Sequence, residues 1–270
     1  SAASDVYKRQ VPVRFSEPEK EVYQKAISEF HAMRGNYFAS TGNSRKDSMM
    51  RLIQQITLLL RISAAPNTVK EYTGGMPVKI AKVMEMLQEM PDQIIAIGVR
   101  HKKVVDAYSA AIRKLMPERP LFVVTGDTTT LAQRRKLRKT LKASGNGILL
   151  CTQQSLPSSV NFEFVNKVII PELHYNNSRM SQFYMRFVRY TSREDKDIYF
   201  VTYLGSIESN QMQMVLAKEK INLFMRGQEQ DLDDIYKTFG VDYNLLETLM
   251  RREENSEGVF EIRWGKQDIS

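Results

Sequence analysis

The chain has 270 residues, a net charge of +8 at pH 7 and a single cysteine, Cys151. One cysteine excludes a framework of intramolecular disulfides and fits a reducing compartment. No apolar run approaches the length of a membrane span, and His31, His101 and His174 lack the spacing of metal ligands. We therefore expect no membrane segment and no bound metal.

The first ninety residues are predicted to be mainly helical. Residues 1–10 (SAASDVYKRQ) open without methionine, and we interpret them as a leader or the end of a gene fragment. Residues 11–90 form a helical entry segment, in which Ser16 and Glu19 fit a capping box. Helices are predicted over residues 18–33, 45–62 and 79–90, with an exposed connector at 68–77.

The following residues alternate between short apolar runs and helical spacing. Strands are predicted at residues 93–99, 121–125, 148–151, 167–170 and 198–203, with helices at 101–116, after residue 128 and at 178–190. This order predicts an α/β fold with a largely parallel sheet and flanking helices. Such sheets bind ligands at the carboxyl ends of their strands. Three polar loops are expected there: Arg100-His101-Lys102, Gly126-Asp127-Thr128 and Thr152-Gln153-Gln154.

Charge is unevenly distributed along the chain. Residues 100–145 hold twelve Lys or Arg against three acidic residues, whereas residues 228–255 hold eight acidic residues against three Lys or Arg. A basic block is the electrostatic footprint expected of a protein that binds phosphate backbones. A solvated helix is the preferred interpretation for Lys136, Lys139 and Lys142. Loops at strand ends are better phosphate contacts, because they also offer backbone N–H groups.

The predicted helix at 178–190 (SRMSQFYMRFVRY) separates two kinds of side chain. With 3.6 residues per turn, one face is apolar and carries Met180, Phe183, Tyr184, Phe187 and Val188. The other face carries Arg179, Gln182, Arg186 and Arg189. This face spells Q-x-x-x-R-x-x-R, and taken alone it also fits a solvated helix with surface ion pairs.

The Q-x-x-x-R-x-x-R pattern resembles motif VI of superfamily-two helicases and DNA translocases. Upstream, residues 147–175 resemble motif V of the Swi/Snf branch, with Ser159-Val160-Asn161-Phe162 in place of its G-x-N-L ending. The run QIIAIGV at 93–99 is similar to motif IV. The likeness covers about residues 11–225 and is to a divergent, viral or bacterial, member. It implies a RecA-like C-terminal lobe with a brace helix at 91–226, followed by a helical tail at 227–270.

The resemblance implies a role for each candidate site residue. Arg186 and Arg189 would be arginine fingers that stabilise charge on the γ-phosphate of ATP, and Gln182 would orient the phosphates. Ser159 and Asn161 would line the nucleotide side of motif V. The three polar loops, from Arg100 to Lys102, Gly126 to Thr128 and Thr152 to Gln154, would contact the backbone of duplex DNA with weak sequence preference.

The chain lacks the nucleotide-binding half of such a motor. It contains no G-x-x-x-x-G-K-[S/T] P-loop and no acidic D-E-x-H box for Mg²⁺. In the family both belong to an N-terminal RecA-like lobe, which would precede residue 11 and act as partner to this chain. We therefore expect that lobe to bind most of the ATP and Mg²⁺, and this chain alone to hold no cofactor. The resemblance implies a cytoplasmic location, or a nuclear one in a eukaryote.

Two functions from different classes remain open. The first is the C-terminal half of an ATP-dependent DNA helicase or translocase. The second is a non-enzymatic RecA-like module that binds nucleic acid or a protein. Gln182, Arg186 and Arg189 favour the motor, because a binding module has no need of them. A Rossmann-type metabolic enzyme is disfavoured, since no G-x-G-x-x-G follows any predicted strand.

Overall fold

The computed structural model describes residues 6–126, 130–156, 160–174, 177–188 and 194–208, together with two short strands near the C-terminus. The helices are α1 (Glu17–Ala39), α2 (Gly42–Ala64), η1 (Pro66–Thr68), α3 (Val78–Glu89), α4 (Lys102–Leu115), α5 (Leu131–Ser144), η2 (Gln153–Ser155) and α6 (Asn177–Tyr184). The strands are β1 (Val6–Val13), β2 (Ile95–Val99), β3 (Leu121–Val124), β4 (Ile148–Thr152), β5 (Lys167–Ile170), β6 (Lys196–Tyr203), β7 (Glu253–Glu254) and β8 (Phe260–Glu261).

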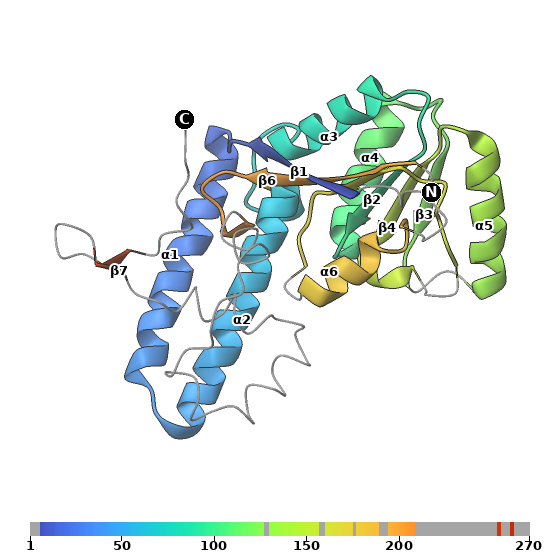
Figure 1. The fold of residues 1–270 in the computed structure, drawn as a ribbon. Coiled ribbons are helices and arrows are strands. Elements are labelled where there is room, and N and C mark those ends of the chain that lie inside the picture. Colours follow the sequence, from blue (N-terminus) through green and yellow to red (C-terminus); the bar gives the residue numbers. More distant parts are fainter. Residues whose placement is uncertain are drawn as a thin grey trace.

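The centre of the molecule is a six-stranded sheet with the order β1-β6-β5-β2-β4-β3, in which every neighbouring pair is parallel. All residues of β2 and β4 are buried, as expected for strands covered on both faces. Figure 1 shows the sheet edge-on between its helices. This arrangement confirms the predicted RecA-like α/β fold class.

Successive residues of the central strands pack into separate cores. Ile95, Ile97 and Val99 of β2 lie in a cluster with residues of α3 and α4. Ala96, between them, lies in a second cluster with residues of α5, α6 and the segment after β4. Side chains alternate between the faces of a strand, so these two clusters place α3 and α4 on one face and α5 and α6 on the other.

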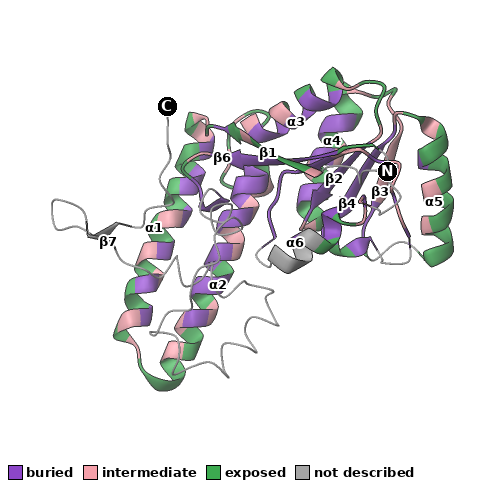
Figure 2. Ribbon diagram, in the orientation of Figure 1, coloured by how far each residue is buried: buried purple, intermediate pink, exposed green. Residues whose placement is uncertain are grey.

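The helices α1 and α2 form a hairpin beside the β1 edge of the sheet (Figure 1). The turn between them ends at Gly42, whose φ of 59° falls in the left-handed region that favours glycine. Their facing sides are buried, as Figure 2 shows, and share an apolar core that includes Phe30, Tyr37, Ile53 and Ile56. The hairpin therefore has its own core, joined to the sheet near Ile207.

The predicted elements differ from the observed ones mainly at their ends. Strand β1 begins at Val6, inside the segment interpreted as a leader, and pairs with β6. Ile207 and Glu208 are helical, and the rest of the brace helix that the resemblance implies before residue 227 lies outside the described residues. So does the predicted helical tail, apart from the antiparallel pair β7 and β8. In the described ranges, no helix has both the length and the apolar character that crossing a bilayer requires.

Candidate functional site

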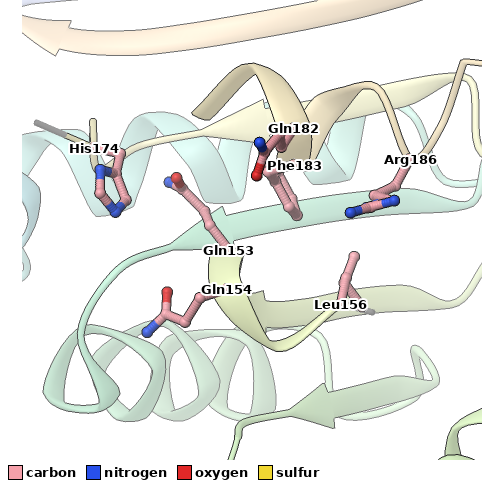
Figure 3. A pocket seen from close by; sticks show the side chains of 7 residues that line it. All are labelled: Gln153, Gln154, Leu156, His174, Gln182, Phe183 and Arg186. Carbon is pink, nitrogen blue, oxygen red and sulfur yellow. The ribbon is translucent and has the colours of Figure 1, made fainter. Parts of the chain in front are cut away.

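A cavity of about 180 Å³ opens at the carboxyl ends of β4 and β5, beside α6. Figure 3 shows the side chains that line it, which are Gln153, Gln154, Leu156, His174, Gln182, Phe183 and Arg186. The chain leaves β2 for α4 on one face of the sheet, whereas the segments that follow its neighbours β4 and β5 pack in the cluster on the other face. A crevice is expected where the chain leaves neighbouring strands in opposite directions, and ligands of open α/β sheets bind there.

The position of α6 is set by a close contact with β2. The ring of Phe183 occupies the space above Gly98, where an added Cβ would lie 2.2 Å from Phe183 Cε1. Phe183 also packs edge-on against Phe187, with ring centroids 5.3 Å apart. Glycine is therefore required at this point of the strand, because a larger residue would push the helix away. With Phe183 buried, Gln182 is exposed at the mouth of the cavity.

The prediction of one helix over residues 178–190 is wrong at its C-terminal end. Helix α6 stops at Tyr184, and Arg186 lies in the turn that follows. Its N–H donates to the Phe183 carbonyl at 3.1 Å, and its carbonyl accepts from the N–H of Phe162 at 3.4 Å. Arg186 and Gln182 consequently share a cavity without continuing one helical stripe. Arg189 lies outside the described residues.

A buried carboxylate organises the loop after β2. Glu172 has no exposed surface and accepts hydrogen bonds from the backbone N–H groups of Arg100, at 2.7 Å, and His101, at 3.1 Å. Its other oxygen pairs with His101 Nδ1. Both N–H groups stand at the N-terminus of α4, where the helix dipole favours a negative charge. Sequence reasoning missed this role, although an acid directly after the apolar run VIIP was a usable signal.

The loop after β4 is fixed by buried side chains. Gln153 donates through Nε2 to the carbonyls of Gly98, at 3.2 Å, and Glu172, at 2.7 Å. Its Oε1 is buried and has no hydrogen-bond partner among the described residues. Thr152 is buried too and bonds to Ser155 through its hydroxyl. Of the three loop residues predicted to contact nucleic acid, Gln154 alone presents its side chain to solvent.

The remaining predicted residues lie around this edge. His101 and Lys102 begin α4, and Gly126 follows β3, close enough for an added Cβ to lie 3.4 Å from Ser155 Oγ. Asn161 is half-buried and does not line the cavity; its carbonyl accepts from Arg138 Nε at 2.5 Å. Asp127, Thr128 and Ser159 lie outside the described residues.

Part of the basic block lies in α5, where its side chains form one exposed face of the helix. Figure 1 places α5 at the outer edge of the sheet. Leu141 is the buried residue of this helix, and its exposed basic residues are Arg135, Lys136, Lys139 and Lys142. The helix has no acidic residue in its first turn to offset them. This surface offers a polyanion several cations within one to two helical turns.

The described part of the chain shows neither a reactive cysteine nor a metal-binding cluster. Burial raises the pKa of the Cys151 thiol, which leaves it protonated and unreactive at neutral pH. Within the described ranges, no three His, Cys, Asp or Glu side chains gather as a metal ion would require. The cavity is also smaller than the roughly 300–1,000 Å³ that encloses a typical small ligand. It fits part of a ligand, such as one phosphate group.

Comparisons with known proteins give a clear answer at the level of structure. No family model and no curated protein matches the sequence. The C-terminal part of the Fun30 ATPase domain matches with a TM-score of 0.60 and 14% identity, over 88% of this chain and 99% of that one. The Sulfolobus solfataricus SWI2/SNF2 ATPase core, in complex with dsDNA, matches with a TM-score of 0.65 and 16% identity, over 88% and 51%. The C-terminal domain of that ATPase gives 0.59 and 15%, over 84% and 90%.

These similarities establish the fold. The chain has the fold of the C-terminal domain of a Swi2/Snf2 ATPase, as the sequence motifs predicted. It spans about half the length of the Sulfolobus ATPase core.

Proposed function

We propose that this chain is the C-terminal lobe of a Swi2/Snf2-type, ATP-dependent DNA translocase. The observation that carries the proposal is the cavity in which Gln182 and Arg186 meet Gln153, where the chain leaves β2 and its neighbours β4 and β5 for opposite faces of the sheet. Its position is where the fold places ligands, and its residues include the two described members of the Q-x-x-x-R-x-x-R pattern.

Arg186 supplies charge to the nucleotide. Arg186 is half-buried and lines the cavity, and its guanidinium carries N–H donors in a planar fork that matches the oxygens of a phosphate. Gln182 lies exposed beside it and orients the phosphate, and Arg189 is the second finger. ATP sits mainly on an N-terminal lobe, where Mg²⁺ would offset phosphate charge. A cavity of about 180 Å³ supports this division, since it is smaller than the cavities that enclose a whole small ligand.

The DNA-binding side comprises the loops at the same edge of the sheet and the exposed basic residues of α5. Arg100, His101 and Lys102 follow β2, Gly126 follows β3 and Gln154 follows β4. Backbone N–H groups and basic side chains bind phosphates without reading bases, so we propose duplex DNA as partner with weak sequence preference. That the similar Sulfolobus ATPase core was crystallised with dsDNA supports this choice.

The decisive experiment is ATP hydrolysis by this chain joined to its N-terminal lobe, with and without duplex DNA. We expect DNA-stimulated turnover in the wild type and none from the isolated chain. Arg186→Ala should lower kcat by about 10³-fold or more, the scale of arginine-finger losses. Arg186→Lys should recover only a small part of that loss, because an ammonium cannot bond two oxygens in one plane.

The matched control is Arg135→Ala, which removes an exposed arginine of α5 that lies away from the cavity. It should leave kcat at saturating DNA unchanged and weaken DNA binding slightly. Turnover that survives Arg186→Ala at the wild-type rate would overturn the role given to Arg186.

The second candidate is a RecA-like module that binds nucleic acid without hydrolysing ATP. The exposed basic face of α5 favours it, since binding alone accounts for such a face. The same assay separates the two candidates. A folded two-lobe protein that binds duplex DNA and shows no DNA-stimulated turnover would establish the binding module.

A further inference from the structure

The guanidinium of Arg138, on helix α5, is hydrogen-bonded inside the lobe. Nε donates to the Asn161 carbonyl at 2.5 Å, and Nη2 donates to Glu163 Oε1 at 2.6 Å. The same group lies over the ring of Phe164, with Cζ 5.2 Å from the centroid. One planar group therefore holds three points of the segment between β4 and β5, which a lysine could not do.

The segment held by Arg138 is also bonded to the turn that carries Arg186. The N–H of Phe162, which lies between Asn161 and Glu163, donates to the Arg186 carbonyl at 3.4 Å. The Phe162 side chain is buried, and its ring centroid lies 6.2 Å from that of Phe187, the residue after Arg186. A shift of Phe162 would therefore displace the turn that carries Arg186, through the backbone hydrogen bond and through the ring contact with Phe187.

The segment between β4 and β5 is also hydrogen-bonded to the sheet, away from the bond between Phe162 and Arg186. Lys196 of β6 donates through Nζ to the carbonyls of Glu163 and Val165, the latter at 3.0 Å. These bonds anchor the side of the segment that faces the sheet. Arg138 ties the segment to α5 through two hydrogen bonds, and Lys142 of the same helix also lies over the Phe164 ring. We place the exposed basic residues of this helix on DNA.

We propose that Arg138 is a positioning residue for Arg186, acting through Asn161, Phe162 and Glu163. It holds the segment after β4 so that the Arg186 turn keeps its place at the cavity. The inference rests on the proposed function for its effect on catalysis. Its effect on the geometry of the Phe162–Arg186 link is independent of ATP.

The first test measures hydrogen exchange of the isolated chain, which needs no nucleotide. Arg138→Ala should speed the exchange of the Phe162 amide, the donor to Arg186, by about 10-fold or more. Arg135→Ala, three residues earlier on the exposed face of α5, is the control and should leave that exchange unchanged. Unaltered exchange of the Phe162 amide in Arg138→Ala would overturn the proposal.

The second test measures ATP turnover in the two-lobe protein. Arg138→Ala should lower kcat about 10-fold to 100-fold with the KM for ATP nearly unchanged, because a misplacement near 1 Å can cost that much in rate. Arg138→Lys should stay close to the alanine variant, and Glu163→Gln should lie between alanine and wild type.

A double-variant cycle then distinguishes positioning from general stability. If Arg138 acts through Arg186, adding Arg138→Ala to Arg186→Ala should lower kcat no further. A full, independent loss in that background would show that Arg138 acts elsewhere and would sink the proposal. A wild-type protein without turnover would refute the proposed function, while the exchange result would still decide the Phe162–Arg186 link.

Discussion

Glu208 and Glu172 are both completely buried in this lobe, as is Glu19, but the surroundings of Glu208 and Glu172 differ. Both oxygens of Glu208 accept from Lys79 Nζ, at 2.5 and 2.8 Å, and one also accepts from the N–H of Tyr203 at 2.8 Å. Lys79 is itself fully buried. Glu172 instead pairs with His101, whose side chain is 28% exposed. The Glu172 carbonyl accepts from Gln153 of the cavity, whose Oε1 has no hydrogen-bond partner in the part of the chain that the structure describes.

The polar groups around Glu208 are buried from solvent and hydrogen-bonded to one another. The Tyr203 hydroxyl donates to Glu19 Oε1 at 2.6 Å and accepts from the N–H of Lys79 at 3.1 Å. Glu19 also accepts from the N–H groups of Ser16 and Val78, each at 2.7 Å. These bonds join the start of α1, the start of α3 and the end of β6.

The comparison separates two uses of buried polar groups. Where every donor and acceptor is matched inside the lobe, the groups fix how the hairpin meets the sheet. Where an acceptor beside the cavity has no partner among the described residues, the groups hold in place the loops that line the cavity. The two regions touch at one point, since Lys79 Nζ also donates to the carbonyl of Pro171, the residue before Glu172, at 2.9 Å.

The largest expected effect is the loss of Lys79. Lys79→Met leaves Glu208 buried without its counter-ion and should lower the free energy of unfolding by about 3–5 kcal/mol, measured by chemical denaturation. Lys79→Met combined with Glu208→Leu should recover much of that loss. The control is Lys82→Met, whose exposed pair with Glu85 at 3.3 Å should contribute less than about 0.5 kcal/mol. Equal losses of unfolding free energy in Lys79→Met and Lys82→Met would contradict the difference drawn between the buried Glu208 region and the surface.

The next effect is a pH dependence from Glu208. Burial raises its pKa from 4.5 to about 7, against the opposing charge of Lys79. The native state therefore retains a proton that the unfolded state releases, so this contribution is full below pH 4.5 and is lost as the pH rises through 7. Relative to Glu208→Gln, the wild type should lose up to about 3 kcal/mol of stability across that window. A difference that stays constant with pH would contradict the assignment.

At the cavity, Gly98→Ala should cost about 1–3 kcal/mol of stability, because the new methyl group overlaps the Phe183 ring. Phe183→Leu added to Gly98→Ala should restore part of the loss by giving the methyl group room. Gly35→Ala is the control, since an added Cβ there meets nothing within 4 Å inside helix α1. It should raise stability by about 0.5–1 kcal/mol. Thermal or chemical unfolding of the three variants would decide the matter.

The smallest effect on stability is expected at Glu172. Glu172→Gln keeps an acceptor for the N–H groups of Arg100 and His101 and removes the charge, so it should cost about 1–2 kcal/mol. Because these residues shape the loop placed on DNA, duplex binding should weaken as well. A loss of unfolding free energy as large as that of Lys79→Met would mean that Glu172 and Glu208 contribute to stability in the same way.

Local patterns in the sequence predicted the central strands well, because each is a short apolar run between polar turns. Strand β5 was predicted with its observed bounds, and β4 within one residue. Strand β1 was missed because most of its residues are exposed and its partner, β6, lies near the other end of the described chain. The end of α6 was missed for a related reason. The Arg186 carbonyl bonds to Phe162, a contact that helical periodicity cannot reveal.

The candidate site was predicted in part. The apolar back of the helix was right, since Met180, Phe183, Tyr184 and Phe187 are all buried. The roles of Glu172 and Gln153 depend on contacts between three different strands, which no local pattern contains. Gly98 did carry a signal, because glycine within a buried strand marks a close approach by another part of the chain.

The bond between the Phe162 N–H and the Arg186 carbonyl has a consequence for how such lobes can diverge. It joins main-chain atoms, so it does not depend on which side chains occupy the two positions. Proline at position 162 is the exception, because proline has no backbone N–H to donate. Sequence drift can therefore rewrite the residues around the cavity while this connection persists.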